Sequence, residues 1–207
     1  MKRSIRPLVL VACALLASCS SNNSTSTAQA PVVAPTPVQQ TTLRGPLIPV
    51  VSTLTLSSTS FANGAPLPAN SAQNGCGGTN QSPQISWSAG PASTQSYVLT
   101  VFDPDAPTGV GFWHWTLYNI PPNTTSLFSG YGSAPTVGTS GLSDYGTLGY
   151  GGPCPPVGDI VHHYIFTVYA LNTVLTGMPV QTSGAYLIFS LRSNVVAMGT
   201  YIGTFQR

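Results

Sequence analysis

The fold is decided by residues 101–115, VFDPDAPTGVGFWHW, in which one strand-like run ends at a proline-containing turn and another begins. This stretch holds two of the chain's four aspartates and one of its three histidines. A second stretch, residues 151–166 (GGPCPPVGDIVHHYIF), holds a third aspartate and the other two histidines. Charges that only solvate a surface are scattered, so this clustering indicates a site. The six clustered residues are Asp103, Asp105, His114, Asp159, His162 and His163.

The composition around these stretches favours β structure in residues 46–207, which we expect to form one domain. Short apolar or alternating runs end at turn residues, which is the pattern of strands. Many short strands separated by turns predict a mainly β fold, either an antiparallel sandwich or an open barrel. We expect strands within residues 52–58, 84–88, 95–103, 113–120, 162–171 and 184–191, and a short helix within residues 191–203.

Residues 1–18 are typical of a signal peptide. A basic start, MKRSIR, precedes an apolar run that is too short to span a bilayer. The run ends in LASC at residues 16–19, which resembles the lipobox of bacterial lipoproteins and implies acylation of Cys19. Ser20 follows in place of aspartate, which points to the outer membrane. The alternative is an ordinary secretory signal in which Cys19 is incidental.

Residues 19–45 are rich in serine, threonine, asparagine and proline and lack hydrophobic periodicity, so we expect a disordered tether. Without the signal, the chain keeps three arginines and no lysine against four aspartates, a formal net charge of −1. The lack of a basic patch argues against nucleic acid as a partner. Membrane attachment would come from acyl chains. The sequence implies no cofactor.

Four cysteines are present, and we assign Cys13 to the signal and Cys19 to the lipid anchor. This leaves Cys76 and Cys154, an even pair in an exported protein, which favours a disulfide. The alternatives are two reduced thiols or two ligands of a metal. The absence of a CxxC pair argues against a structural zinc site.

The motifs together resemble the phosphatidylethanolamine-binding protein family, in its bacterial, Raf kinase inhibitor-like branch. The family pattern is a strand ending in DPDAP, a strand with tryptophan and histidine, and a glycine- and proline-rich loop ending in His-x-Tyr. Here these are residues 103–107, 113–115 and 152–164. The stretches NQSPQISW at 80–87 and GTFQR at 203–207 also match. The resemblance covers roughly residues 50–207.

The resemblance implies a two-sheet antiparallel β-sandwich with few short helices and a small anion pocket at one end. That pocket would take phosphate-bearing small molecules or phospholipid headgroups. Two residues depart from eukaryotic relatives: His163 replaces an arginine, and Cys154 replaces a glycine. The given sequence ends at GTFQR, which leaves no room for their C-terminal helix, so we expect a more open pocket. By position, the ligand-binding residues would be Asp103, Asp105, His114, Gly152, Pro155, Pro156, His162 and Tyr164.

The residue types allow such a site if the carboxylates act behind the ligand. Aspartates in a proline turn accept backbone N–H groups and can orient a histidine ring. His114, His162 and Tyr164 would then face the ligand as donors. Glycines 151 and 152 would let backbone amides approach an oxyanion. Strand alternation places His162 and Tyr164 on one face and turns His163 away.

Three functions remain possible. The first is a lipid-anchored binding protein, not an enzyme, that holds phosphate-bearing ligands. The second is an inhibitor of a kinase or protease. The third is a metal-dependent hydrolase, because aspartate and histidine clusters can bind metal. The absence of HExxH and GxSxG motifs argues against this third function.

Overall fold

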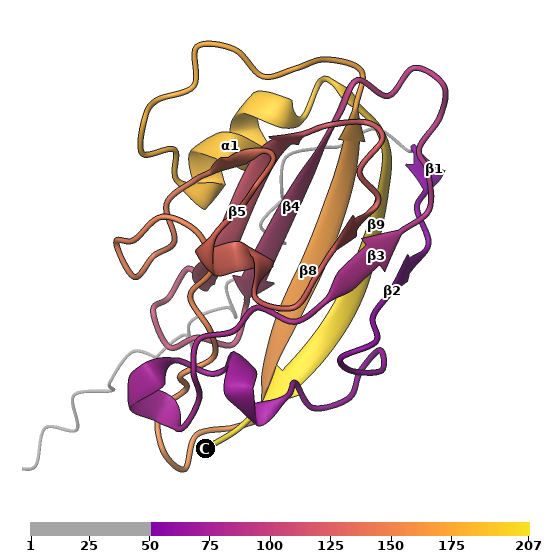
Figure 1. Ribbon diagram of the computed structural model, residues 1–207. Helices are drawn as coiled ribbons and strands as arrows, with labels where there is room; N and C mark the ends of the chain where they lie inside the picture. The colour runs from indigo at the N-terminus through magenta and orange to yellow at the C-terminus, as the bar shows by residue number, and fades with distance from the viewer. Residues whose placement is uncertain (1–50) are drawn as a thin grey trace, which may run out of the picture. The chain divides into compact units, whose positions relative to one another are not determined.

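The computed structural model describes residues 51–207. The predicted signal peptide, the acylation site at Cys19 and the tether lie outside the described residues. Within them, a large twisted sheet faces a small sheet, as Figure 1 shows. This confirms the predicted mainly β, two-sheet fold. None of the helices described in residues 51–207 has the length and hydrophobicity that crossing a bilayer requires.

The large sheet has the strand order β1-β9-β8-β4-β5-β7. Its strands, in that order, are Ser52–Thr53, Val195–Phe205, His162–Leu171, Ser96–Asp103, Phe112–Ile120 and Thr139–Ser140. The neighbouring pairs are antiparallel, except that β1 pairs with β9 in parallel. The small sheet has the order β2-β3-β6, with strands Leu56–Ser57, Ile85–Trp87 and Ser126–Leu127. Three short 3-10 helices lie in the loops: η1 at Ala69–Ser71, η2 at Asn74–Cys76 and η3 at Tyr131–Ser133.

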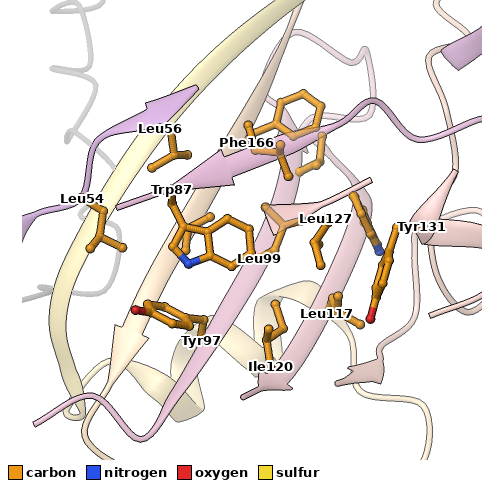
Figure 2. Close-up of a cluster of buried hydrophobic side chains, with 14 of the residues drawn as sticks. Leu54, Leu56, Trp87, Tyr97, Leu99, Leu117, Ile120, Leu127, Tyr131 and Phe166 are labelled. Atoms are coloured by element: carbon orange, nitrogen blue, oxygen red, sulfur yellow. The ribbon is translucent and has the colours of Figure 1, made fainter. Parts of the chain in front are cut away.

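The main core lies between the two sheets, where Figure 2 shows the packed side chains. Alternation along β4 explains how one strand serves two layers. Leu99 and Val101 point into this core, whereas Val98 points to the opposite face. Trp115 on β5 is fully buried in the same layer. Truncating such a residue to alanine typically costs about 3–5 kcal/mol, so this core holds the sheets together.

The opposite face of the large sheet is covered by helix α1, Gly184–Leu191. The prediction of a strand over residues 184–191 is therefore wrong. Two features favour the helix. The Ser183 side chain caps it by accepting the N–H of Tyr186, and Leu187 and Leu191, one turn apart, are buried against the sheet. An apolar run of this length fits either structure by pattern alone, and packing on the sheet selects the helix.

The prediction of a short helix within residues 191–203 is also wrong, because β9 occupies residues 195–205. This strand pairs with β8 along its whole length, from Leu171↔Val195 at one end to His162↔Phe205 at the other. Gly199 lies where β9 packs closely against the backbone at Leu54, and a Cβ at this position would collide with the Leu54 carbonyl. The glycine therefore serves close packing of backbones in a strand.

Candidate functional site

A pocket opens at the end of the large sheet where β4 ends and where β5 and β8 begin. The strand register brings these termini together, since Asp103 pairs with Phe112 and Phe102 pairs with Ile165. The cavity has a volume of about 140 Å³. This is smaller than the roughly 300–1,000 Å³ of pockets for drug-sized ligands. Its lining residues are Asp103, Ala106, Pro107, Thr108, Phe112, His114, Tyr145, Cys154, Pro155, Pro156, His162 and Tyr164.

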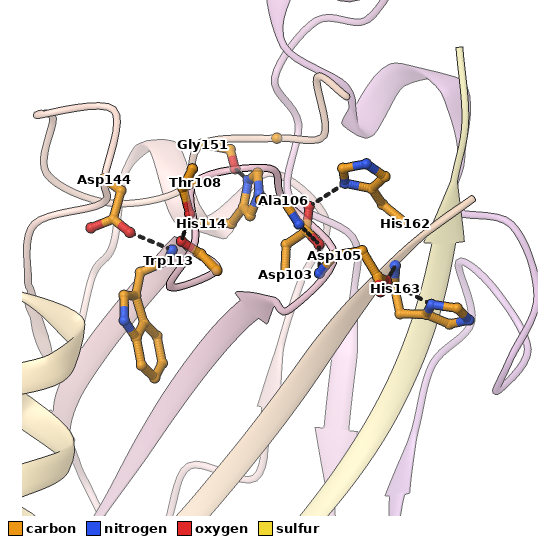
Figure 3. Close-up of polar contacts among 12 residues, drawn as sticks. Asp103, Asp105, Ala106, Thr108, Trp113, His114, Asp144, Gly151, His162 and His163 are labelled. Atoms are coloured by element: carbon orange, nitrogen blue, oxygen red, sulfur yellow. Dashed lines mark hydrogen bonds and ion pairs between the residues drawn. The ribbon is translucent and has the colours of Figure 1, made fainter. Parts of the chain in front are cut away.

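Asp103, the last residue of β4, is a buried carboxylate whose two oxygens have separate partners. Oδ1 accepts the backbone N–H groups of Asp105 (2.9 Å) and Ala106 (3.1 Å) within the turn. Oδ2 accepts Nδ1–H of His162 at 2.7 Å and lies 3.8 Å from Nε2 of His114. Figure 3 shows the two histidines on either side of this carboxylate. Asp103 therefore orients the His162 ring and lies beside the His114 ring.

The protonation states follow from these contacts. Burial alone would raise the pKa of Asp103, but its contacts with two histidines and a backbone N–H outweigh burial and lower that pKa. Burial alone would lower the pKa of His162, but hydrogen bonding and charge at Asp103, then at Asp159, outweigh burial and raise it. Asp159 Oδ2 lies 3.4 Å from the second ring nitrogen, Nε2 of His162. The pocket thus favours an ionised Asp103 beside a protonated His162.

His114 on β5 is held by a different partner. Its Nδ1 lies 2.7 Å from the carbonyl oxygen of Gly151, and a carbonyl can only accept, so Nδ1 carries the proton. The opposite ring nitrogen, Nε2, is thereby directed to the Asp103 side of the pocket. Aromatic rings surround the imidazole, with centroids at 4.9 Å for Phe112, 4.9 Å for Tyr164 and 5.6 Å for Tyr145. This packing fixes the ring's orientation.

Tyr164 on β8 carries the pocket's unsatisfied donor. Its hydroxyl is buried near the Asp103 carboxylate but meets the geometry of a hydrogen bond with no group within residues 51–207. Burial, together with the charge of Asp103, raises the pKa of Tyr164, so the group stays protonated and can donate. A buried polar group without a partner costs about 1–3 kcal/mol, which a bound acceptor would recover. This hydroxyl is therefore a candidate ligand contact.

His163 and Asp105 lie outside the pocket lining. The side chain of His163 is 51% exposed, and Asp105 Oδ2 accepts both its backbone N–H (2.8 Å) and its Nδ1–H (2.7 Å). Figure 3 shows this pair on the side away from His162. The alternation of β8 accounts for the position of His163. Asp105 pairs with His163 instead of facing the pocket, contrary to its place in the predicted ligand set.

The two loop glycines do not offer their amides to a ligand, which corrects the expectation from sequence. The N–H of Gly151 donates to the carbonyl oxygen of His114, and the N–H of Gly152 donates to Asn80 Oδ1 at 2.7 Å. Gly152 is also absent from the lining. Both positions need glycine because there is no room for a side chain. A Cβ at 151 would collide with the Tyr145 ring, and one at 152 would collide with the Ser71 carbonyl.

Sequence reasoning missed two aromatic walls of the pocket, Phe112 and Tyr145. Tyr145 packs against Phe112 with ring centroids 4.7 Å apart, and its hydroxyl donates to the carbonyl oxygen of Gly152 at 3.0 Å. Burial and the charge of Asp103 raise the pKa of Tyr145 to about 12. Phe112 was detectable, since it directly precedes the Trp-His-Trp motif. Tyr145 lies in a glycine-rich loop with no local signal of this role.

The predicted disulfide between Cys76 and Cys154 is confirmed. It joins helix η2 to the loop at residues 153–161, which contributes Cys154, Pro155 and Pro156 to the pocket wall. Pro155 and Pro156, which the family resemblance placed at the ligand site, lie in the pocket lining because this loop forms one wall. Within residues 51–207, no group of three or more histidine, cysteine, aspartate or glutamate side chains is arranged to hold a metal ion.

The fold and the pocket together define a two-sheet β protein with a small polar and aromatic cavity at one end. The sequence pattern of the phosphatidylethanolamine-binding protein family matches residues 57–206, so the chain belongs to that family.

Bacterial relatives agree. UPF0098 protein YbhB of Escherichia coli is 38% identical over 157 residues, which cover 73% of this chain and 99% of YbhB. The protein of Mycobacterium tuberculosis with the name "Putative lipoprotein LppC" is 36% identical over 158 residues, covering 76% of this chain and 75% of LppC. The crystal structure of E. coli YbcL, described as a member of the mammalian family, superposes with a TM-score of 0.71 at 37% identity. That match covers 75% of this chain and 99% of YbcL.

Proposed function

We propose that this protein is a lipid-anchored binding protein whose pocket takes the phosphate group of a small molecule or phospholipid headgroup. The observation that carries the proposal is the buried Tyr164 hydroxyl, which lacks a partner among the described residues and lines the same cavity as His114 and His162. These three side chains converge on one small volume from β5 and β8. A phosphoryl oxygen accepts hydrogen bonds from both donor types, the phenol hydroxyl and the imidazole N–H.

The carboxylate of Asp103 makes anion binding depend on protonation. With neutral histidines, the pocket would present a net negative charge to an anion. Protonating His162, whose pKa is raised, offsets the charge of the Asp103 carboxylate and makes both nitrogens of that ring donors. The ligand is held rather than transformed in this proposal. The test of that point is recovery of phosphoethanolamine unchanged after prolonged incubation with the protein.

The decisive test replaces Tyr164 with phenylalanine and measures both ligand affinity and stability. Tyr164→Phe removes a hydroxyl that has no partner within residues 51–207, so we expect an unchanged or slightly higher free energy of unfolding. It also removes a donor to a charged group, so we expect phosphate and phosphoethanolamine to bind about tenfold or more weakly. Calorimetric titration and urea unfolding measure the two effects.

Tyr131→Phe is the matched control. The Tyr131 hydroxyl lies outside the pocket lining, donates to the Val137 carbonyl and accepts the Val137 N–H, so its loss should cost about 1 kcal/mol of stability and leave affinity unchanged. Equal phosphate affinity in the wild type and Tyr164→Phe would count against the proposed site. So would destabilisation by Tyr164→Phe comparable with that of Tyr131→Phe.

The proposed location is the cell envelope. Its supports are the lipobox-like LASC at residues 16–19 and the similarity to LppC. We further propose the outer membrane, on the strength of Ser20 alone. Acylation at Cys19 would place the binding domain near phospholipid headgroups, which are one source of the proposed ligand.

A further inference from the structure

The proposed anion pocket has a shortage of fixed positive charge. None of its lining residues is lysine or arginine, while Asp103 lines it and Asp159 lies at its histidine. Histidines supply positive charge only while they are protonated. The described residues contain two arginines, Arg192 and Arg207, and neither is within ion-pair distance of a carboxylate in that part of the chain. Their positions therefore decide whether the pocket has a permanent cation.

Arg207 lies at the pocket mouth. Its Nη1 donates to Sγ of Cys154 at 3.4 Å, and Cys154 is a lining residue. Its main-chain oxygen accepts the N–H of Gly158 at 2.9 Å. The preceding residue, Gln206, donates from its side chain to the carbonyl oxygen of Asp159 at 2.8 Å. The segment after β9 is thus tied at three points to the loop that forms one pocket wall, and Figure 1 shows the C-terminus at this end.

Arg192 is at the other end of the sheet. It directly follows α1, near Leu171↔Val195, whereas Arg207 lies just beyond His162↔Phe205. The ten residues of β8 between these points span about 30 Å. The guanidinium of Arg192 is also engaged locally, since it lies 3.7 Å from the centroid of the Phe189 ring and donates to the Phe189 carbonyl. Arg192 therefore carries the same guanidinium group as Arg207 but lies far from the pocket.

We propose that Arg207 is an anion contact at the mouth of the pocket and supplies the part of phosphate affinity that does not depend on histidine protonation. This inference rests on the proposed function and adds to it a residue from outside the cavity lining. Arg207 is exposed, lacks a carboxylate partner among residues 51–207, and is positioned by the loop that also carries Asp159. A guanidinium does not depend on histidine protonation for its charge, and its fork suits phosphate oxygens.

The test compares the purified full-length protein with Arg207→Gln and Arg207→Lys by calorimetric titration. Inorganic phosphate is one probe, and sulfate, which keeps its charge throughout the pH range used, is the other. We expect Arg207→Gln to weaken binding about three- to tenfold at low salt, with a smaller loss for Arg207→Lys. The difference should shrink in about 0.5 M salt, because exposed charges are screened. At alkaline pH, above the raised pKa of His162, residual sulfate binding should disappear in Arg207→Gln.

Arg192→Gln is the matched control and should bind both probes as the wild type does. If Arg207→Gln binds like the wild type while Tyr164→Phe still weakens binding, the role of Arg207 is rejected and the proposed function stands. An affinity loss in Arg207→Gln that does not change with salt would also reject it, because that is the behaviour of a loop-packing role. If the wild type binds neither probe at any pH, the proposed function fails and this inference with it.

Discussion

Asp103 connects the turn, the two histidines and the tyrosine into one site. The residues that follow it provide two of its hydrogen bonds, because Pro104 bends the chain so that the N–H groups of Asp105 and Ala106 reach Oδ1. These bonds leave Oδ2 for the histidines. A buried carboxylate without such partners would be neutral, since burial raises its pKa. The DPDAP turn therefore keeps a charge in the core that can support a protonated imidazole.

The residue-scale prediction concerns pH. Because the pKa of His162 lies above its usual value of 6.5, its protonated fraction grows as pH falls from alkaline values through that raised pKa. Sulfate affinity should therefore rise over the same interval, which begins at a higher pH than it would for a histidine with the usual pKa. Calorimetric titration of sulfate across pH measures this profile.

The matched variants for this prediction are His162→Gln and His163→Gln. Loss of His162 should weaken sulfate binding about ten- to a hundredfold at pH values where it is charged, and should flatten the pH profile. Loss of His163, which pairs with Asp105 outside the lining, should leave the profile intact. A pH-independent wild type would refute the role given to His162. So would equal losses in the two variants.

At the scale of elements, the pocket is formed by three strand ends and by loops that cross them. The strands provide rigid positions for Asp103, His114 and His162, while the loop at residues 153–161 closes one wall. That loop has no strand partner of its own and is held by the disulfide and by contacts with the chain end. Stability and pocket shape are therefore coupled through Cys154.

The element-scale prediction is that the double replacement Cys76→Ser and Cys154→Ser lowers the free energy of unfolding by about 4 kcal/mol. The bridge closes a loop with a sequence separation of 78 residues, and loop entropy sets this magnitude. Hydrogen exchange should increase first in residues 153–161, because the bridge is their covalent attachment. Urea unfolding and exchange mass spectrometry measure the two effects. Two free thiols in native protein from an oxidising compartment would contradict the bridge itself.

At the scale of the whole molecule, the proposal joins a membrane anchor to a domain that binds phosphate groups. Replacing Cys19 with alanine should abolish incorporation of a palmitate analogue and release the protein into the soluble fraction or leave it unprocessed. Metabolic labelling and fractionation measure this outcome, with Cys13→Ala as the control that should remain labelled. Label retained in Cys19→Ala would refute the lipoprotein proposal. The binding domain described by residues 51–207 does not depend on this result.

Much of the fold can be predicted from local sequence because its signals are local. Residues 95–103 and 113–120 alternate or run apolar as buried strands do, and the turn between them is specified by Pro104 and Pro107. The even number of remaining cysteines and the expected export favour a bridge between Cys76 and Cys154, and the structure contains it. The convergence of Asp103, His114 and His162 was foreseen through the family's ordered motifs rather than through periodicity, which says nothing about distances between strands.

The remaining features depend on packing between distant segments, and a local pattern cannot contain them. The apolar run at 184–191 is compatible with strand or helix, and only burial of Leu187 and Leu191 on the sheet selects α1. The amides of Gly151 and Gly152 appeared free for a ligand. In the structure they donate hydrogen bonds to His114 and Asn80, which come from other parts of the chain. Arg207 reaches Cys154 of the pocket wall because β9 pairs with β8 to its end. Each outcome was decided by which group occupies the nearby space, and that is set only once the chain has folded.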